Sequence, residues 1–301
     1  MNTRLAVVGV ATALTVVLTG CGQSTGDVAA APSADATTSA TTSASVAAPA
    51  PRLASIDNFR DLAGPDGGYT TVDGRRIREG VVYRSNALTT TDADAAVLDT
   101  LGIARIFDLR TTAEIAKAAD RVPAGAEYTN VNILGDASSG AVTSSVDLST
   151  PESAAAVLVD ANRQFVSNPA MRAQFGTLLT EMASTDGPLL FHCTAGKDRA
   201  GWTSAMLLTI AGVDEATVME NYLLTNEYSQ ASIEAKAAQV SAAKGAQAGE
   251  AMRVLMGVSP AFLTAGFDEI DAQFGSVDTY LSEGLGLSAD TLAVLRTKLT
   301  V

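Results

Sequence analysis

The stretch "LLFHCTAGKDRAGW", residues 189–202, decides how the middle of the chain folds. Gly187-Pro188 ends the helical pattern before it, and Leu189-Leu190-Phe191 is a short continuous apolar run, typical of a buried parallel strand. After the loop, residues 202–213 form a longer apolar run, typical of a core helix. The sequence therefore predicts a strand, a tight loop and a helix, with Cys193 at the end of the strand.

Three further apolar segments predict strands that accompany residues 189–191. They cover residues 78–83, 104–109 and 129–133, and helical stretches separate them. Alternation of strands and helices is typical of an α/β fold with a doubly wound, mostly parallel sheet and flanking helices. Ligands of such sheets bind beyond the carboxyl ends of the strands, where the loop after residue 191 is expected.

Several helix starts support this interpretation. Thr111 and Glu114 have the spacing of a capping box, in which each side chain binds a backbone N–H of the other residue. Thr150-Pro151 and Ser259-Pro260 each place a capping residue before a proline at the first helical position. We therefore expect helices to begin at these three points.

The N-terminal residues read as a targeting signal. Residues 1–4 are positively charged, residues 5–17 are almost wholly apolar, and residues 18–20 are followed by Cys21. This pattern resembles a bacterial lipoprotein signal over residues 1–21, with Cys21 lipidated and the chain anchored to the cell membrane or envelope outside the cytoplasm. The alternative is an uncleaved membrane helix, although the apolar run is shorter than the roughly 20 residues that a spanning helix needs.

Composition divides the rest of the chain into two parts. Residues 22–52 consist largely of Ala, Ser, Thr and Pro, so they bury too little apolar surface to fold and are predicted to be a disordered tether. Residues 53–301 mix apolar and polar side chains over a length that suits one sizeable domain. Within that domain, residues 228–256 have a helical but weakly apolar composition.

The charge and the cysteines limit the classes of function. A net charge of −13 argues against general binding of nucleic acid or anionic lipid, because both require a positive surface. Lipidation of Cys21 would leave Cys193 without a disulfide partner, so that thiol is either buried and inert or retained for its chemistry. The chain has a single histidine and no spaced cluster of His, Cys and carboxylate ligands, so the sequence gives no indication of a metal site.

The predicted loop suits an anion. Backbone N–H groups of a tight loop that opens onto a helix N-terminus point at a common centre, and the helix dipole adds positive potential there. The same field favours the thiolate of Cys193 over the thiol. Arg199, six residues later, offers a planar fork that can bind two phosphate oxygens. A bare Cys-x5-Arg spacing is a weak signal, and His192, Gly196, Gly201 and the flanking elements make it specific.

The loop and four other segments resemble one known family. The segment "HCTAGKDRAG", residues 192–201, is similar to the loop of the cysteine-dependent protein tyrosine phosphatases, in the bacterial and fungal branch of that family. The other segments occur in the family's order and are "NFRDLAG" at 58–64, "VYRSNAL" at 82–88, "IFDLRTTAEI" at 106–115 and "NYLLTNEY" at 221–228. Together they span most of residues 56–301.

The resemblance implies a metal-independent phosphomonoesterase that acts through a phosphocysteine. Its best-known members are secreted bacterial phosphatases with phosphotyrosine, phosphoserine or phosphothreonine, and phosphoinositide substrates. Cys193 would be the nucleophile, and Arg199 would bind the phosphoryl oxygens. The backbone N–H groups expected to share that binding belong to Thr194, Ala195, Gly196 and Lys197.

The general acid is less clearly indicated. Asp198, inside the loop, resembles the acid of lipid-phosphatase relatives and is the first choice. Asp108, at the end of a predicted strand, is the second choice. Its alternative role is a structural ion pair with an arginine such as Arg110 or Arg60.

Three other residues near the nucleophile have open roles. Lys197 either adds positive charge over the phosphate or is simply solvated. His192 is expected to be a buried imidazole that supports the loop backbone and the thiolate, with a role as base as the alternative. Ala200 stands where the wider superfamily has Ser or Thr, whose hydroxyl eases the departure of the cysteine sulfur, and Thr203 is the nearest substitute.

Two rival functions remain. A non-catalytic phosphate-binding module would need Arg199 and the loop glycines but not Cys193 with Asp198. A sulfurtransferase of the rhodanese kind also mounts cysteine on such a loop, but its loop is shorter. In the resembled family, residues 228–256 supply helices that close over the active site as a lid, and a solvated surface helix is the alternative.

Overall fold

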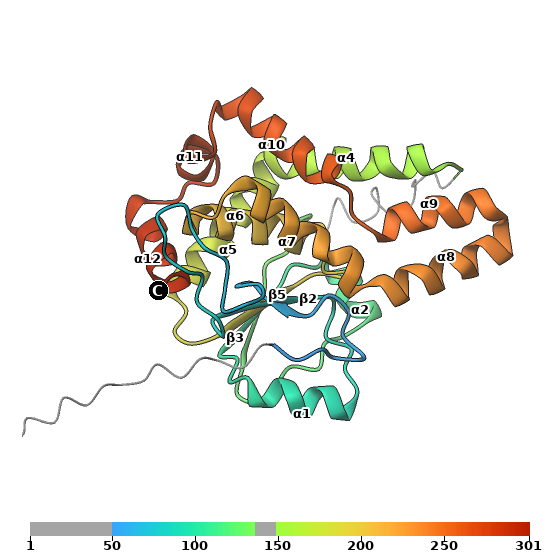
Figure 1. Cartoon of the computed structure of the whole chain (residues 1–301), viewed down its shortest axis with the longest axis horizontal. Helices are drawn as coiled ribbons and strands as arrows, with labels where there is room; N and C mark the ends of the chain where they lie inside the picture. Colours follow the sequence, from blue (N-terminus) through green and yellow to red (C-terminus); the bar gives the residue numbers. More distant parts are fainter. Residues whose placement is uncertain (1–49, 136–148) are drawn as a thin grey trace, which may run out of the picture. The chain divides into compact units, whose positions relative to one another are not determined.

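A five-stranded sheet lies at the centre of this computed structural model, which describes residues 50–135 and 149–301 (Figure 1). The strand order is β1-β2-β5-β3-β4, with β1 antiparallel to β2 and the other neighbours parallel. The strands are β1 (Arg60–Asp61), β2 (Val82–Ser85), β3 (Arg105–Asp108), β4 (Glu127–Asn130) and β5 (Leu189–His192). The predicted α/β fold with a mostly parallel sheet is confirmed.

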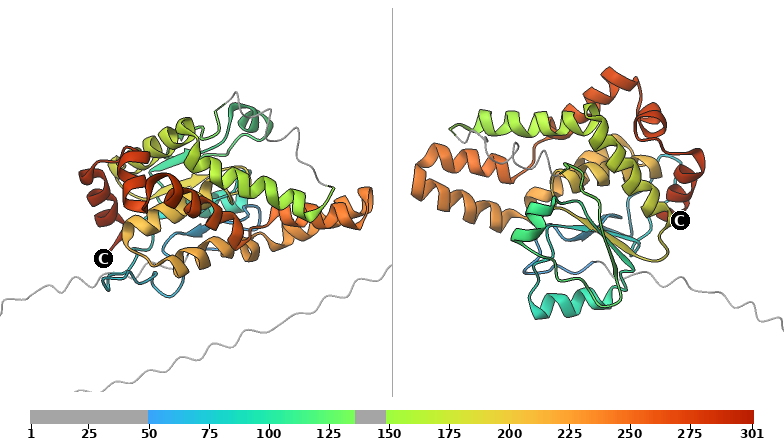
Figure 2. Two further views of the ribbon diagram at one scale, coloured as in Figure 1. Left: turned by 90° about the horizontal axis from the view of Figure 1, so that it is seen from above. Right: turned by 180° about the vertical axis from the view of Figure 1, so that it is seen from behind.

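Helices flank both faces of the sheet (Figure 2). In chain order they are α1 (Asp92–Thr100), α2 (Thr112–Lys117), α4 (Pro151–Ser167), α5 (Pro169–Ser184), α6 (Arg199–Ala211), α7 (Glu215–Tyr228), α8 (Gln230–Lys244), α9 (Ala246–Met256), α10 (Pro260–Phe274), α11 (Val277–Thr279), the π-helical turn η1 (Tyr280–Gly284) and α12 (Ala289–Leu299). The predicted signal segment and Cys21 lie outside the described residues, as does most of the predicted tether.

Side chains of the central strands alternate between two apolar cores. Phe107 of β3 and Phe191 of β5 belong to the larger core. Ile106 and Leu190 belong to the smaller core on the other face, which Leu98 of α1 completes. Because both faces are covered, the central strand is apolar at successive positions, which explains the unbroken run before the loop.

The strand predicted over residues 78–83 is displaced. The observed strand β2 begins only at Val82, and the segment before it pairs with the end of the chain. The backbone N–H of Arg78 donates to the carbonyl of Leu299 at 2.7 Å. The first half of the predicted strand therefore forms hydrogen bonds with a segment outside the sheet.

The strand predicted over residues 129–133 is also displaced, toward the N-terminus. Strand β4 covers Glu127–Asn130 and forms the edge of the sheet, with mostly exposed side chains. Val131 and Ile133 follow the strand and are buried in the larger core. Their apolar character marks a segment that enters the core after the strand has ended.

The three predicted helix starts are confirmed, and the helix after the loop begins earlier than predicted. Thr111 and Glu114 form the capping box of α2, and Thr150 and Ser259 occupy the N-cap positions of α4 and α10. Helix α6 begins at Arg199 instead of residue 202. Arg199 therefore lies in the first helical turn, where the backbone fixes its direction.

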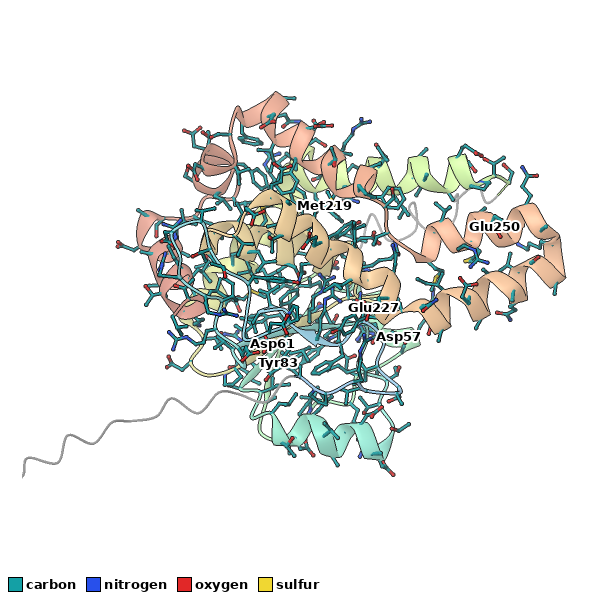
Figure 3. The ribbon with its side chains drawn as sticks, viewed as in Figure 1. Asp57, Asp61, Tyr83, Met219, Glu227 and Glu250 are labelled. Carbon is teal, nitrogen blue, oxygen red and sulfur yellow. The ribbon has the colours of Figure 1, made fainter. Side chains whose placement is uncertain are left out.

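Residues 228–256 form an antiparallel hairpin of α8 and α9, which follows the end of α7. Glu227 marks that end of α7, and Glu250 lies on α9 (Figure 3). Helix α9 also packs against α4. Within residues 50–135 and 149–301, no helix has both the length and the apolar character needed to cross a bilayer.

Candidate active site

The loop between β5 and α6 carries the predicted nucleophile. Cys193 follows the strand directly, has a free thiol and is 2% exposed. Gly196 has φ = +66°, and a Cβ atom there would lie 2.4 Å from the carbonyl oxygen of Ser85. The loop can turn this closely along β2 only because residue 196 has no side chain.

Two side chains hold the loop by one carbonyl. The Gly196 carbonyl accepts hydrogen bonds from Asn58 Nδ2 at 2.7 Å and from Arg84 Nη2 at 2.6 Å. Arg84 Nη1 donates to Ser204 Oγ on α6 at 2.8 Å. Burial lowers the pKa of Arg84 to about 10, although the negative charge of an ionised Cys193 opposes that effect. Arg84 therefore adds a buried cation close to the nucleophile.

A second buried arginine fixes the support around Asn58. Arg60 donates to the carbonyls of Asn58 at 3.2 Å and Asn221 at 3.0 Å. Asn58 Nδ2 also contacts Thr225 Oγ1 of α7 at 3.3 Å. These contacts join residues 58–64 to residues 221–228. Arg60 thus binds backbone carbonyls, and the arginine that pairs with Asp108 is Arg110, not the alternative Arg60.

Arg199 is held by a carboxylate whose sequence pattern indicates only a helix cap. Arg199 Nη1 and Nη2 donate to the two carboxylate oxygens of Glu114 at 2.8 and 2.7 Å, and Nη1 also donates to the Leu109 carbonyl at 3.1 Å. Thr194 Oγ1 donates to the same carboxylate. Burial raises the pKa of Glu114, but its bonds with Arg199 and Thr194 outweigh this and bring it to about 2.

Two hydrogens of Arg199 are left for a ligand. Leu109 and Glu114 use both hydrogens of Nη1 and one hydrogen of Nη2. Among the described residues, no hydrogen-bond partner uses Nε or the other hydrogen of Nη2. These two hydrogens lie on one edge of the guanidinium and point in parallel, which is the arrangement that binds two oxygens of a phosphate.

The two acidic candidates have different surroundings. Asp198 is the N-cap residue of α6, and its side chain is 25% exposed. Lys197 Nζ donates to Asp198 Oδ1 at 2.9 Å, and because Lys197 is only 4% exposed, the alternative of a solvated lysine is wrong. Asp108 is fully buried in a two-pronged pair with Arg110, and Tyr128 donates to it at 2.6 Å. These contacts favour the structural alternative for Asp108.

His192 lies fully buried at the end of β5. Its Nδ1 is 3.5 Å from the Cys193 carbonyl, and its Nε2 is 3.1 Å from Asp120 Oδ2, an ion-pair distance without the angle of an aligned hydrogen bond. His192, Asp108 and Asp120 bring together three atoms that could ligate a metal ion. Arg110 Nη2 donates to both carboxylates, so a guanidinium already supplies the cation between them.

The position after Arg199 is tightly packed. Ala200 is fully buried. The nearest hydroxyl on the helix, Thr203 Oγ1, donates to the Arg199 carbonyl at 2.9 Å, and Ser204 Oγ donates to the Ala200 carbonyl at 2.8 Å. Both hydroxyls donate their hydrogen to the helix backbone. Thr203 therefore does not replace the Ser or Thr hydroxyl that is missing at residue 200.

Comparisons with known proteins agree with this geometry. A family model described as "Tyrosine phosphatase family" matches residues 51–301. A Cupriavidus necator protein assigned by name to the tyrosine-protein phosphatases is 32% identical over 238 residues, covering 77% of this chain and 82% of that protein. A tyrosine-protein phosphatase of Nostoc commune is 31% identical over 225 residues, covering 69% and 70%. The triple specificity protein phosphatase PtpB of Mycobacterium tuberculosis is 26% identical over 275 residues, covering 79% and 95%.

Proposed function

The chain belongs to the tyrosine phosphatase family and is a protein tyrosine phosphatase, and we propose that it works through a covalent phosphocysteine without a metal ion or other cofactor. One observation carries the proposal. Cys193 follows a buried strand, and two buried guanidinium groups, those of Arg84 and Arg199, lie close enough to respond to its charge. Such surroundings place positive charge where phosphoryl oxygens would lie during attack by Cys193.

The first half of the reaction forms the intermediate. The Cys193 thiolate attacks phosphorus, the S–P bond forms, and the P–O bond to the leaving group breaks with its electron pair on oxygen. The free edge of Arg199 and the loop N–H groups bind the equatorial oxygens while charge builds on them. Glu114 keeps that guanidinium plane fixed throughout.

The second half of the reaction hydrolyses the intermediate and restores the free enzyme. Water attacks the phosphocysteine, the P–S bond breaks with its electron pair on sulfur, and inorganic phosphate leaves. Asp198 gives its proton to the leaving oxygen in the first half and takes one from water in the second. Asp198 serves this role better than Asp108, because Asp198 borders the loop and is partly exposed while Asp108 is buried against Arg110.

The substrate range is proposed to extend beyond phosphotyrosine. Phosphoserine, phosphothreonine and phosphoinositides present the same phosphoryl oxygens to Arg199 and the loop. The name of the Mycobacterium tuberculosis relative gives triple specificity for that protein. That name supports a broad range here, with phosphotyrosine proteins as the main substrate class.

The cellular location is proposed from the N-terminal sequence alone. Lipidation at Cys21 would anchor the chain to the membrane or envelope, with residues 53–301 outside the cytoplasm. We expect Cys21→Ser to move the protein from the membrane fraction to the soluble fraction. An unchanged distribution would contradict the anchor.

The test of the reaction compares wild type with Cys193→Ser in EDTA. The substrates are a phosphotyrosine peptide, a phosphoserine peptide and a short-chain phosphoinositide. We expect turnover by wild type, none by the variant, and retained binding of inorganic phosphate by the variant, because only the nucleophile is lost. Full activity of Cys193→Ser would rule out the thiol mechanism, and phosphate binding by an inactive wild type would favour the binding module.

The test of the acid uses leaving groups of different basicity. Asp198→Asn should slow phosphoserine hydrolysis far more than hydrolysis of an aryl phosphate with a good leaving group, because only the poor leaving group requires the proton. Asp108→Asn serves as the matched comparison. An equal loss on both substrates by Asp198→Asn would assign the acid role elsewhere.

A further inference from the structure

Asp120 lies outside the loop, and its buried carboxylate contacts His192, the residue before Cys193. Its Oδ1 accepts a hydrogen bond from the Leu88 backbone N–H at 2.8 Å, and its Oδ2 accepts one from Arg110 Nη2 at 2.7 Å. The same Oδ2 lies 3.1 Å from His192 Nε2. Burial raises the pKa of Asp120, but its contacts with His192 and Arg110 outweigh this and lower it.

Both ring nitrogens of His192 face acceptors. Nε2 faces the Asp120 carboxylate, while Nδ1 faces the Cys193 carbonyl at 3.5 Å and Asp108 Oδ1 at 3.9 Å. A bare nitrogen this close to a carboxylate or carbonyl oxygen would be repelled by it, and the ring is fully buried, so water offers little relief. The arrangement suits an imidazole ring with a hydrogen on each nitrogen.

The count of buried charges agrees with that state. Asp108 and Asp120 supply two negative charges in contact with one guanidinium, that of Arg110. Tyr128 donates a neutral hydrogen bond to Asp108 and adds no positive charge. A positively charged His192 would balance the group, and burial of an unbalanced carboxylate costs more than burial of a matched set.

We propose that Asp120 is a positioning residue that holds His192 with hydrogens on both ring nitrogens, beside the backbone of Cys193. The ring then places a fixed positive charge next to the nucleophile and a donor toward the carbonyl at the start of the loop. The catalytic consequence rests on the function proposed above, whereas the state of the ring does not.

The ring can be observed directly, because His192 is the only histidine of the chain. Two-bond ¹H–¹⁵N correlation spectra of the ¹⁵N-labelled wild-type protein at pH 7 should show two ring nitrogens with similar, protonated-type shifts. One protonated and one bare nitrogen in wild type would overturn the proposal without any variant.

The variant Asp120→Asn tests the cause. Asparagine keeps the shape and one acceptor oxygen but turns an N–H₂ donor toward Arg110 or His192. We expect the ring to change to a form with one bare nitrogen. Asp92→Asn is the matched control, because Asp92 is an exposed carboxylate that pairs with Arg121, the residue next to Asp120. Ring signals that are the same in wild type and Asp120→Asn would overturn the proposal.

Kinetics separate this role from a merely structural one. With an aryl phosphate, Asp120→Asn should lower kcat/KM by roughly tenfold or more and move the acidic limb of its pH profile to higher pH, because the thiolate loses a positive neighbour. Inhibition by inorganic phosphate should change less than about threefold, since Arg199 remains in place. Equal losses in phosphate binding and turnover would indicate a distorted loop and contradict the positioning role. A wild-type protein without turnover would refute the proposed function and leave the ring measurement valid.

Discussion

Glu114 shows how one side chain serves two structures. Its carboxylate accepts the Thr111 N–H at 2.9 Å as part of the capping box of α2, and it also holds the guanidinium of Arg199. Helix α2 and Arg199, the proposed phosphate ligand, are thus fixed by the same group. A substitution at Glu114 therefore acts on activity through the direction of Arg199.

We predict that Glu114→Gln lowers kcat/KM by on the order of 10²-fold, because a misplaced Arg199 loses oxygens that it binds in the transition state. Steady-state kinetics with an aryl phosphate measure this. The matched control is Glu127→Gln, an exposed carboxylate on β4. A Glu114→Gln variant as active as the control would show that Arg199 keeps its direction without the ion pair.

Glu114 also predicts a dependence of stability on pH. Its pKa is about 2 in the folded protein against an ordinary value of 4.5, so the unfolded chain binds the proton more readily. The stabilisation is fully present above pH 4.5 and is lost as the pH falls toward 2. Denaturant unfolding of wild type should show this loss between those pH values, and Glu114→Gln should lose less stability over the same range.

At this scale the sequence predicted the candidate residues of the loop but not the residues that hold them. Cys193, Arg199 and Asp198 follow from their spacing within one loop. Glu114 was found only as a helix cap, since its bond with Arg199 joins residues 85 positions apart. The contacts of Asp120 and Arg84 were not predicted for the same reason. Short-range sequence patterns carry no information on which distant side chains lie in contact.

At the scale of elements, the loop after β5 depends on a residue with no side chain. Gly196 combines a positive φ with a close approach to the Ser85 carbonyl. We predict that Gly196→Ala destabilises the protein by about 1–3 kcal/mol and removes most activity, because both the backbone angle and the contact must change.

Gly74→Ala is the matched control for that variant. Gly74 also has a positive φ, +86°, but a Cβ atom there would meet nothing within 4 Å. Chemical denaturation should show a smaller loss for Gly74→Ala, with activity kept. Equal losses would mean that the backbone angle alone, and not the approach to β2, makes glycine necessary at residue 196.

The elements themselves were predicted unevenly. Strands β3 and β5 were found because both of their faces are buried, which leaves a continuous apolar run. Strand β2 was displaced since Arg78 pairs with the distant Leu299, and β4 was displaced since its own side chains are exposed while the apolar residues follow it. Burial, and not strand formation as such, is what the apolar pattern reports.

At the scale of the whole molecule, binding at the loop should stabilise the folded domain. A ligand that binds only the folded state adds about 2.7 kcal/mol at one hundred times its Kd. We predict that inorganic phosphate raises the Tm of the wild-type protein and has little effect on Arg199→Ala, which lacks the fork. Differential scanning calorimetry over a phosphate series measures this, and an equal rise in both proteins would place the bound phosphate elsewhere.

The burial of the proposed nucleophile affects how reagents reach it. Only 2% of Cys193 is exposed, and the flanking Lys197 and Arg199 are 4% and 8% exposed. A reagent must therefore enter the loop before it can react with the thiol. Cys193 is the only cysteine left in Cys21→Ser, so alkylation of that variant reports on this thiol alone. The rate with a bulky alkylating reagent relative to a small one then measures access to the loop, in the way that a protected amide reports local opening through hydrogen exchange.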